Sequence, residues 1–226
     1  MKGYLDMFTK FARTFALAAG IAVVSAFSAS TASAALINSG PGSGVCIKGV
    51  SLGGGACTLQ AITPHPAWQT NLPGGSAAVW VSYANTGVGA GSVSPASSAS
   101  FLMQVTETIN VSPINNVLLN LKVWADDTAG VYLNGIQIFA PNFTQNTCAN
   151  GPIGCQPNEF AVFNVMLAAG STNTIDMQVY QTGGGPSGLL YTGSTKEAPE
   201  PSTIALIAMA LLSMFGFGMM RRRADA

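Results

Sequence analysis

Apolar and polar residues alternate along several segments of this chain, and the alternation limits its fold more than any other feature. In residues 116–124 (NVLLNLKVW), the odd-numbered positions are apolar, whereas Asn120 and Lys122 stand between them. Successive side chains of a β-strand point to opposite faces of a sheet, so this pattern predicts a strand with one buried face. Related patterns, also predicted as strands, occur in residues 77–84, 101–109, 159–167 and 173–181.

Turn signals separate these segments. Asn134-Gly135 lies between VYL and IQIF, which predicts a two-residue type I′ hairpin. Two long stretches of small and polar residues, 88–100 and 141–158, are predicted as loops. Short strands at this spacing, with no sustained helical period between them, predict an all-β fold: an antiparallel β-sandwich of jelly-roll type.

The first 34 residues have the layout of a secretory signal peptide. Basic residues precede the apolar run 15–27, and Ala32-Ser33-Ala34 has the A-x-A form of a cleavage site before Ala35. We therefore leave residues 1–34 out of the folded domain and expect the remainder to be exported.

The last residues have the layout of a membrane anchor. Residues 204–220 carry no charge, and seventeen helical residues rise roughly 25 Å, enough to cross a hydrocarbon core. Arg221, Arg222 and Arg223 follow and favour a cytoplasmic location for residues 221–226. The alternative is a buried C-terminal helix, but Ser213 is the one clearly polar residue in the run, so we favour a transmembrane helix.

Pro199, Glu200 and Pro201, the apolar run and the arginine cluster together resemble the PEP-CTERM sorting signal. Proteins with this tail resemble substrates of exosortase in bacteria with a Gram-negative envelope that make exopolysaccharide. The resemblance implies that the tripeptide is the recognition element and that an exosortase-type protease is a partner. It also implies a temporary inner-membrane anchor, followed by sorting to the cell surface or extracellular matrix.

The segment between the two signals is long enough for one domain. We predict a loose, disulfide-pinned lead-in over residues 35–58, the sandwich over 59–193 and a linker over 194–203. Residues 35–197 carry three lysines against six acidic residues, a formal charge of −3. No basic patch is available for phosphates, so nucleic acid is excluded as a partner.

Four cysteines lie in the exported part, which favours disulfides. Four cysteines allow three pairings, and we favour the local pairs Cys46–Cys57 and Cys148–Cys155, each of which brackets a glycine-rich loop. A zinc site is disfavoured because there is no C-x-x-C motif and His65 is the one histidine.

The runs LKVWADDTAGVYLNGIQI (121–138) and AAGSTNTIDMQVYQTGGGPSGLL (168–190) resemble the galactose-binding-like jelly roll of many exported bacterial proteins. The resemblance covers roughly residues 60–193 and implies a fold that often binds carbohydrate. It also implies a closing strand after the turn Gly185–Leu189.

Sugar sites combine an aromatic platform with side chains that bond hydroxyl groups. The alternation puts Trp124 and Tyr180 on the outward faces of their strands, with Asp127, Asn134 and Gln178 as polar partners. Trp80 and Phe163 are predicted in the core.

Catalytic motifs are absent from the sequence, and His65 between two prolines has no nucleophile pattern near it, so we predict that the chain is not an enzyme. Asp126 and Asp127 could hold a structural Ca²⁺, and no other cofactor is predicted. The alternative that we favour is a turn in which Asp127 accepts the backbone N–H groups of Thr128 and Ala129.

The sequence as a whole predicts an exported, PEP-CTERM-sorted protein of the cell surface or exopolysaccharide matrix. Its predicted role is non-catalytic, as a carbohydrate-binding or matrix-structuring module. The alternatives are a structural surface protein that binds no sugar and a glycan-processing enzyme.

Overall fold

A computed structural model describes residues 35–72, 76–90, 92–95, 100–145, 147–149 and 151–197. The predicted signal peptide (1–34), the Pro-Glu-Pro motif, the apolar run 204–220 and the arginine cluster lie outside the described residues. Within the part described, no helix has the length and apolar character of a membrane span.

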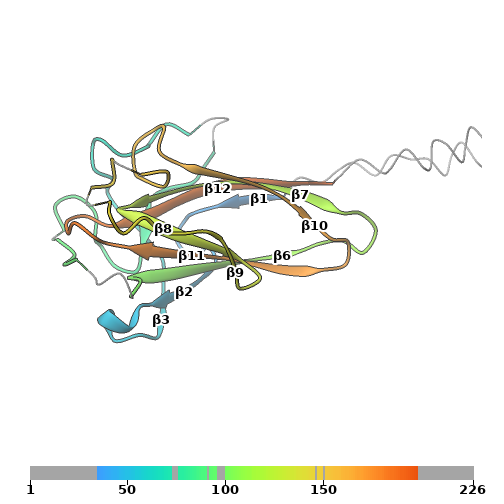
Figure 1. Cartoon of the computed structure of the whole chain (residues 1–226), viewed down its shortest axis with the longest axis horizontal. Helices are drawn as coiled ribbons and strands as arrows, with labels where there is room; N and C mark the ends of the chain where they lie inside the picture. The colour runs from blue at the N-terminus through green and yellow to red at the C-terminus, as the bar shows by residue number, and fades with distance from the viewer. Residues whose placement is uncertain are drawn as a thin grey trace, which may run out of the picture. The chain divides into compact units, whose positions relative to one another are not determined.

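The domain is a sandwich of two six-stranded antiparallel sheets (Figure 1). Sheet A has the order β10 (Ala161–Leu167), β7 (Val117–Asp126), β12 (Gly188–Glu197), β5 (Val81–Ser82) and β4 (Gln60–Ala61), and β1 (Leu36–Asn38) also pairs with β12. Sheet B has the order β3 (Ala56–Cys57), β2 (Val45–Lys48), β6 (Met103–Asn110), β11 (Thr172–Tyr180), β8 (Thr128–Leu133) and β9 (Ile136–Phe139). The one described helix is the short 3₁₀ turn η1 (Val50–Leu52). The predicted antiparallel β-sandwich is confirmed.

The core lies between the sheets and is built from the apolar rows that the alternation predicts. Leu121 and Val123 of β7 face inward from sheet A, and Val105 of β6 and Met177 of β11 face inward from sheet B, each at most 1% exposed. Phe163 also lies in this core, as predicted. Period-2 patterning therefore fixes the face that each long strand buries.

A second apolar cluster covers one end of the outer face of sheet A. This tryptophan cluster consists of Ile62, Trp68, Trp80, Trp124, Cys155 and Leu190. Trp124 and Leu190 are paired on neighbouring strands and point outward, and the rings of Trp68 and Trp80 pack at a tilt of 41° with centroids 4.3 Å apart. Residues of the segments 62–72, 78–80, 148–149 and 151–160 thus close over this end of the sheet. Trp80 is buried as predicted, but outside the main core.

The hairpin and disulfide predictions are confirmed. Asn134 (φ 51°) and Gly135 (φ 77°) both have left-handed backbones between β8 and β9, as a type I′ turn requires. Disulfides join Cys46 to Cys57, which are directly opposite on β2 and β3, and Cys148 to Cys155.

The prediction of a loose lead-in over residues 35–58 is wrong. β1 pairs with β12 and β2 pairs with β6, so this segment contributes to both sheets. The sequence did not reveal these strands because they have only two to four residues, too few to show a period.

The boundary at residue 193 between sandwich and linker is also wrong. β12 continues to Glu197 and pairs with β7 along its whole length, from Gly188 opposite Asp126 to Glu197 opposite Val117. Its last residues are polar, which is typical of a linker, but the apolar β7 beside it supplies a complete hydrogen-bonding edge. The strand expected over 77–84 is shorter than predicted, since β5 comprises Val81 and Ser82.

Candidate functional site

The outer face of sheet B carries a cluster of hydroxyl, amide and aromatic side chains. Cross-strand register sets Gln104 opposite Gln178 and Thr106 opposite Asp176, and Asp176 in turn lies opposite Tyr132. We call this cluster the polar face; it consists of Gln104, Thr106, Tyr132, Asp176, Gln178 and Tyr180. Asp176 is its one charged residue.

A directional chain of hydrogen bonds runs across the polar face. The Tyr180 hydroxyl donates to Gln178 Oε1 (2.8 Å), and Gln178 Nε2 donates to Gln104 Oε1 (2.9 Å). Gln104 Nε2 and the Thr106 hydroxyl both donate to Asp176 Oδ1. The other carboxylate oxygen of Asp176 accepts no hydrogen bond from the described residues. The chain therefore fixes each side chain and leaves a free acceptor at its end.

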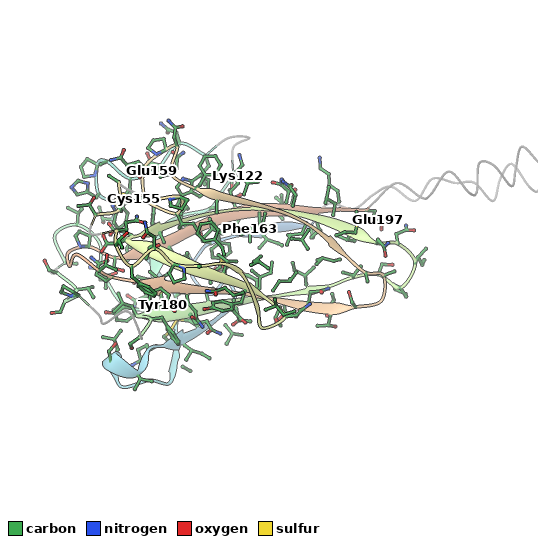
Figure 2. The ribbon with its side chains drawn as sticks, viewed as in Figure 1. Lys122, Cys155, Glu159, Phe163, Tyr180 and Glu197 are labelled. Carbon is green, nitrogen blue, oxygen red and sulfur yellow. A yellow bond between two sulfur atoms is a disulfide. The ribbon has the colours of Figure 1, made fainter. Side chains whose placement is uncertain are left out.

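Aromatic rings border the polar face. Tyr180, labelled in Figure 2, is 8% exposed, and Phe143 packs edge-to-face on it with ring centroids 5.1 Å apart. Phe143 itself is 41% exposed, so it presents its ring to solvent. Burial, and secondarily the neighbouring Tyr132, raises the pKa of Tyr180 to about 12, so its hydroxyl remains protonated and donating.

The ring of Tyr132 packs closely on Gly130 of the same strand. A Cβ atom on Gly130 would lie 3.3 Å from Tyr132 Cε2 and 3.1 Å from Pro141 Cδ. The tyrosine ring thus lies across the glycine, and its hydroxyl accepts a hydrogen bond from Gln137 Nε2 (3.3 Å).

The loop that carries Phe143 is fastened to the end of β7 and the start of β8. Asn142 N donates to Thr128 Oγ1 (3.0 Å), and buried Gln145 Nε2 donates to the backbone carbonyl of Asp127 (2.6 Å). The Thr182 hydroxyl donates to the carbonyl of Gln145. Phe143 is therefore held beside Tyr180 by polar contacts on either side of it.

Asp126 and Asp127, which we call the acid pair, lie directly beneath this loop. Asp127 is 3% exposed, and its Oδ2 accepts the backbone N–H groups of Thr182 (2.8 Å) and Gly183 (2.7 Å). The favoured prediction of donors from Thr128 and Ala129 is therefore wrong; the donors come from the β11–β12 loop, far away in sequence. Because Asp127 is buried, it positions the loops and is not itself on the polar face.

Asp126 is buried beside the Cys148–Cys155 disulfide, with the side chains of Asp127 and Trp68 as its polar neighbours. It is 6% exposed, and Cys148 and Cys155 each place the sulfur within 4.8 Å of its carboxylate. The two sulfurs are bonded to each other and do not provide metal ligands. Burial, then the neighbouring carboxyl of Asp127, raises the pKa of Asp126 to about 8.

Two buried amide oxygens lie near the acid pair without hydrogen-bond partners among the described residues. These are Gln145 Oε1 and Gln181 Oε1, and both residues are 1% exposed. No lysine, arginine or histidine is paired to the acid pair in the described part of the chain.

The structure brings together two of the five predicted sugar contacts. Tyr180 and Gln178 are neighbours on the polar face. Trp124 is on the outward face of its strand, as the alternation indicates, but loops cover it to 1% exposure. Asn134 is exposed, and its side chain serves the hairpin: Nδ2 donates to Asn173 Oδ1, and Oδ1 accepts from Thr174 N.

Five members of the site were not among the predicted contacts: Gln104, Thr106, Tyr132, Phe143 and Asp176. The strand alternation places four of them outward, but only cross-strand register brings these four together with Gln178. Phe143 is in a loop with no periodic signal.

No protein-family model matches the chain, and no curated protein matches it. Weak similarities to solved structures exist. The GH26-CBM35 β-(1,4)-mannanase of Podospora anserina is 17% identical, with a TM-score of 0.32, over 63% of this chain and 26% of its own. The exo-β-1,3-galactanase of Phanerochaete chrysosporium is 13% identical, with a TM-score of 0.29, over 75% of this chain and 29% of its own. The β-glucosidase of Kluyveromyces marxianus is 15% identical, with a TM-score of 0.29, over 45% and 12%. This chain thus spans less than a third of each of these proteins, and at these TM-scores neither a family nor a function is assigned from them.

Proposed function

We propose that this protein is a non-catalytic carbohydrate-binding module that takes a neutral polysaccharide on the polar face. The observation that carries the proposal is the row of hydrogen-bonded amide and hydroxyl groups that ends beside the exposed ring of Phe143. A sugar ring complements both kinds of group, because it has hydroxyl groups around its edge, which can form hydrogen bonds, and apolar C–H groups on its faces, which can pack on an aromatic ring.

The polar face is organised before any ligand arrives. Its side chains already hold one another, so little rotamer freedom is lost on binding, which favours affinity. The free oxygen of Asp176 is an acceptor for sugar hydroxyls, and Phe143 offers a surface for ring C–H groups. The one charge on the face is negative, which disfavours anionic polymers.

We propose further that the acid pair takes a Ca²⁺ ion. Adjacent carboxylates buried without a basic partner are costly, and a hard cation that prefers oxygen ligands would neutralise them. The residues that would hold it are Asp126 and Asp127, through their buried carboxylates, and backbone carbonyl oxygens would complete the set of ligands. When bound, the ion would supply charge neutralisation and brace the loop that presents Phe143.

We also propose that the domain acts outside the cytoplasm, as an exosortase-sorted protein of the cell surface or exopolysaccharide matrix. Two disulfides support an oxidising compartment.

We also propose that the sandwich is a jelly roll. The strands from β5 to β12 alternate between the sheets, with β8 and β9 as a hairpin within sheet B, and this alternation supports the assignment.

Affinity gel electrophoresis of the full chain in detergent tests the binding proposal. Gels that contain a neutral exopolysaccharide should retard the wild type, relative to its mobility in a gel without the polymer, and should retard Asp176→Asn less by the same comparison. If no neutral polysaccharide retards the protein, the proposal is overturned. Turnover of the polymer would likewise contradict the non-catalytic assignment.

A further inference from the structure

A pocket of about 350 Å³ opens between β1 and β6, on the side of the sandwich where these two strands approach each other. Its size is within the range of small-ligand sites. Its polar lining includes Asn38, Ser43, Glu107, Asn110 and Thr195, and apolar side chains such as Ile37 and Val117 complete the wall. Its lining shares no residue with the polar face.

Glu107 is the charged residue of this pocket. It belongs to the inward-facing row of β6, where Met103, Val105 and Ile109 are buried core residues. The hydroxyl of fully buried Tyr191 donates to Glu107 Oε1, and Ser43 Oγ lies 3.0 Å from the same hydroxyl. The second oxygen, Oε2, has no hydrogen-bond partner among the described residues. One carboxylate oxygen is therefore anchored and the other is available to the pocket.

No described residue balances the charge of Glu107. Of the residues that line the pocket, none is basic. Burial raises the pKa of Glu107, because the charged carboxylate loses contact with water between the sheets and has no cation beside it. The hydrogen bond from Tyr191 does not by itself require an acidic residue at position 107, because the amide oxygen of a glutamine would accept it as well.

The segment before β2 packs closely on the Glu107 side chain at Gly44. A Cβ atom there would lie 3.2 Å from Glu107 Oε1 and 2.9 Å from the carbonyl oxygen of Thr106. The glycine lets the segment before β2 pass directly over the carboxylate and fixes it at the wall of the pocket.

We infer that this pocket binds a small primary ammonium compound that also carries hydroxyl groups, with its ammonium group paired to Glu107. An ammonium group supplies the missing positive charge and donates to Oε2, a charge-assisted hydrogen bond of the stronger kind. The hydroxyl groups of Ser43 and Thr195 are partners for hydroxyl groups on the same ligand. An amino sugar has this combination.

Calorimetric titration of the full chain with glucosamine, at neutral pH, tests the inference. Glucose is the matched probe, since it has the same ring without the ammonium group. We expect glucosamine to bind about tenfold or more tightly than glucose, and Glu107→Gln to remove the difference while it keeps the acceptor for Tyr191. Phe143→Ala, on the polar face, should leave the difference unchanged, so failure of this inference is distinguishable from failure of the proposed function.

A second variant keeps the test decisive if Glu107→Gln does not fold. Ala35 is exposed at the wall of the pocket, and Ala35→Lys would bring a competing ammonium group without touching the Tyr191 contact. It should also abolish the preference for glucosamine. Equal binding of both sugars to the wild type, or a preference that survives both variants, would overturn the inference.

Discussion

Phe143 and Tyr180 meet edge to face, with ring centroids 5.1 Å apart, although one belongs to the β9–β10 loop and the other to the end of β11. The loop stays there because Gln145 is fastened to the backbone of Asp127. A buried anchor therefore determines where an exposed aromatic ring lies. At this end of the sandwich, the hydrogen bonds of buried Gln145 thus fix the position of the solvent-exposed Phe143 ring.

Removal of the loop anchor should weaken binding without removing any surface group. Gln145→Ala deletes hydrogen bonds from Nε2 to the carbonyls of Asp127 and Ile153. We expect a loss of about 1–3 kcal/mol in the free energy of unfolding, because the buried carbonyls lose their donor. Polysaccharide affinity should fall about fivefold as Phe143 loses its fixed position. Denaturant melts and affinity gels measure the two effects; unchanged affinity would show that the loop does not need this anchor.

A methyl group at residue 130 should displace Tyr132. In Gly130→Ala the new Cβ atom would meet the tyrosine ring at 3.3 Å and Pro141 at 3.1 Å, so the ring must shift by a few tenths of an ångström. We expect weaker polysaccharide retardation with a stability loss of about 1 kcal/mol. Gly40→Ala is the matched control, because no atom lies within 4 Å of its Cβ position. Equal retardation of both variants would contradict a role for Tyr132.

The tryptophan cluster should not tolerate a larger residue at position 188. A Cβ atom on Gly188 would lie 2.7 Å from Ile62 Cδ1 and 3.2 Å from Trp80 Cε3. Gly188→Ala should therefore lower the free energy of unfolding by about 1–3 kcal/mol through overpacking, with a changed tryptophan emission spectrum. A melt indistinguishable from that of Gly40→Ala would mean that the cluster adjusts freely.

Stability should fall as pH rises in the presence of a calcium chelator. Burial raises the pKa of Asp126 from its ordinary value of 3.8 to about 8, so its contribution is fully present below the ordinary value and is lost as pH rises through about 8. Between about pH 5 and pH 8 the free energy of unfolding should decline by up to about 1.4 kcal/mol per pH unit. Urea melts across this range measure the slope.

Asp126→Asn is the matched variant for that measurement, since it keeps the shape of the side chain and cannot ionise. Its melts should lack this decline. A slope that persists in the variant would assign the pH dependence to another group. Added Ca²⁺ should raise the midpoint of the wild type at pH 8 and leave that of the variant nearly unchanged.

The long strands could be predicted from sequence because each repeats a two-residue period over seven or more residues, as in β7 and β11. Short strands such as β1 and β2 could not, and β12 was cut short because its polar end resembles a linker. At the site, Gln178 and Tyr180 followed from the alternation. The positions of Gln104, Asp176 and Tyr132 beside one another depend on cross-strand register. The position of Phe143 depends on hydrogen bonds between its loop and the residues Asp127 and Thr128. The periodicity of a single strand predicts neither. Trp124 shows the converse, since an outward position on a strand does not ensure exposure when loops return over the sheet.

Calorimetric titration of a neutral exopolysaccharide into wild type, Phe143→Ala and Val162→Ala tests the central claim most directly. Val162 is a matched apolar residue, 45% exposed on the outer face of sheet A. We predict that the wild type and Val162→Ala bind equally and that Phe143→Ala loses about tenfold or more in affinity. Equal affinities for all three proteins, or a loss confined to Val162→Ala, would contradict the assignment of carbohydrate binding to the polar face of sheet B.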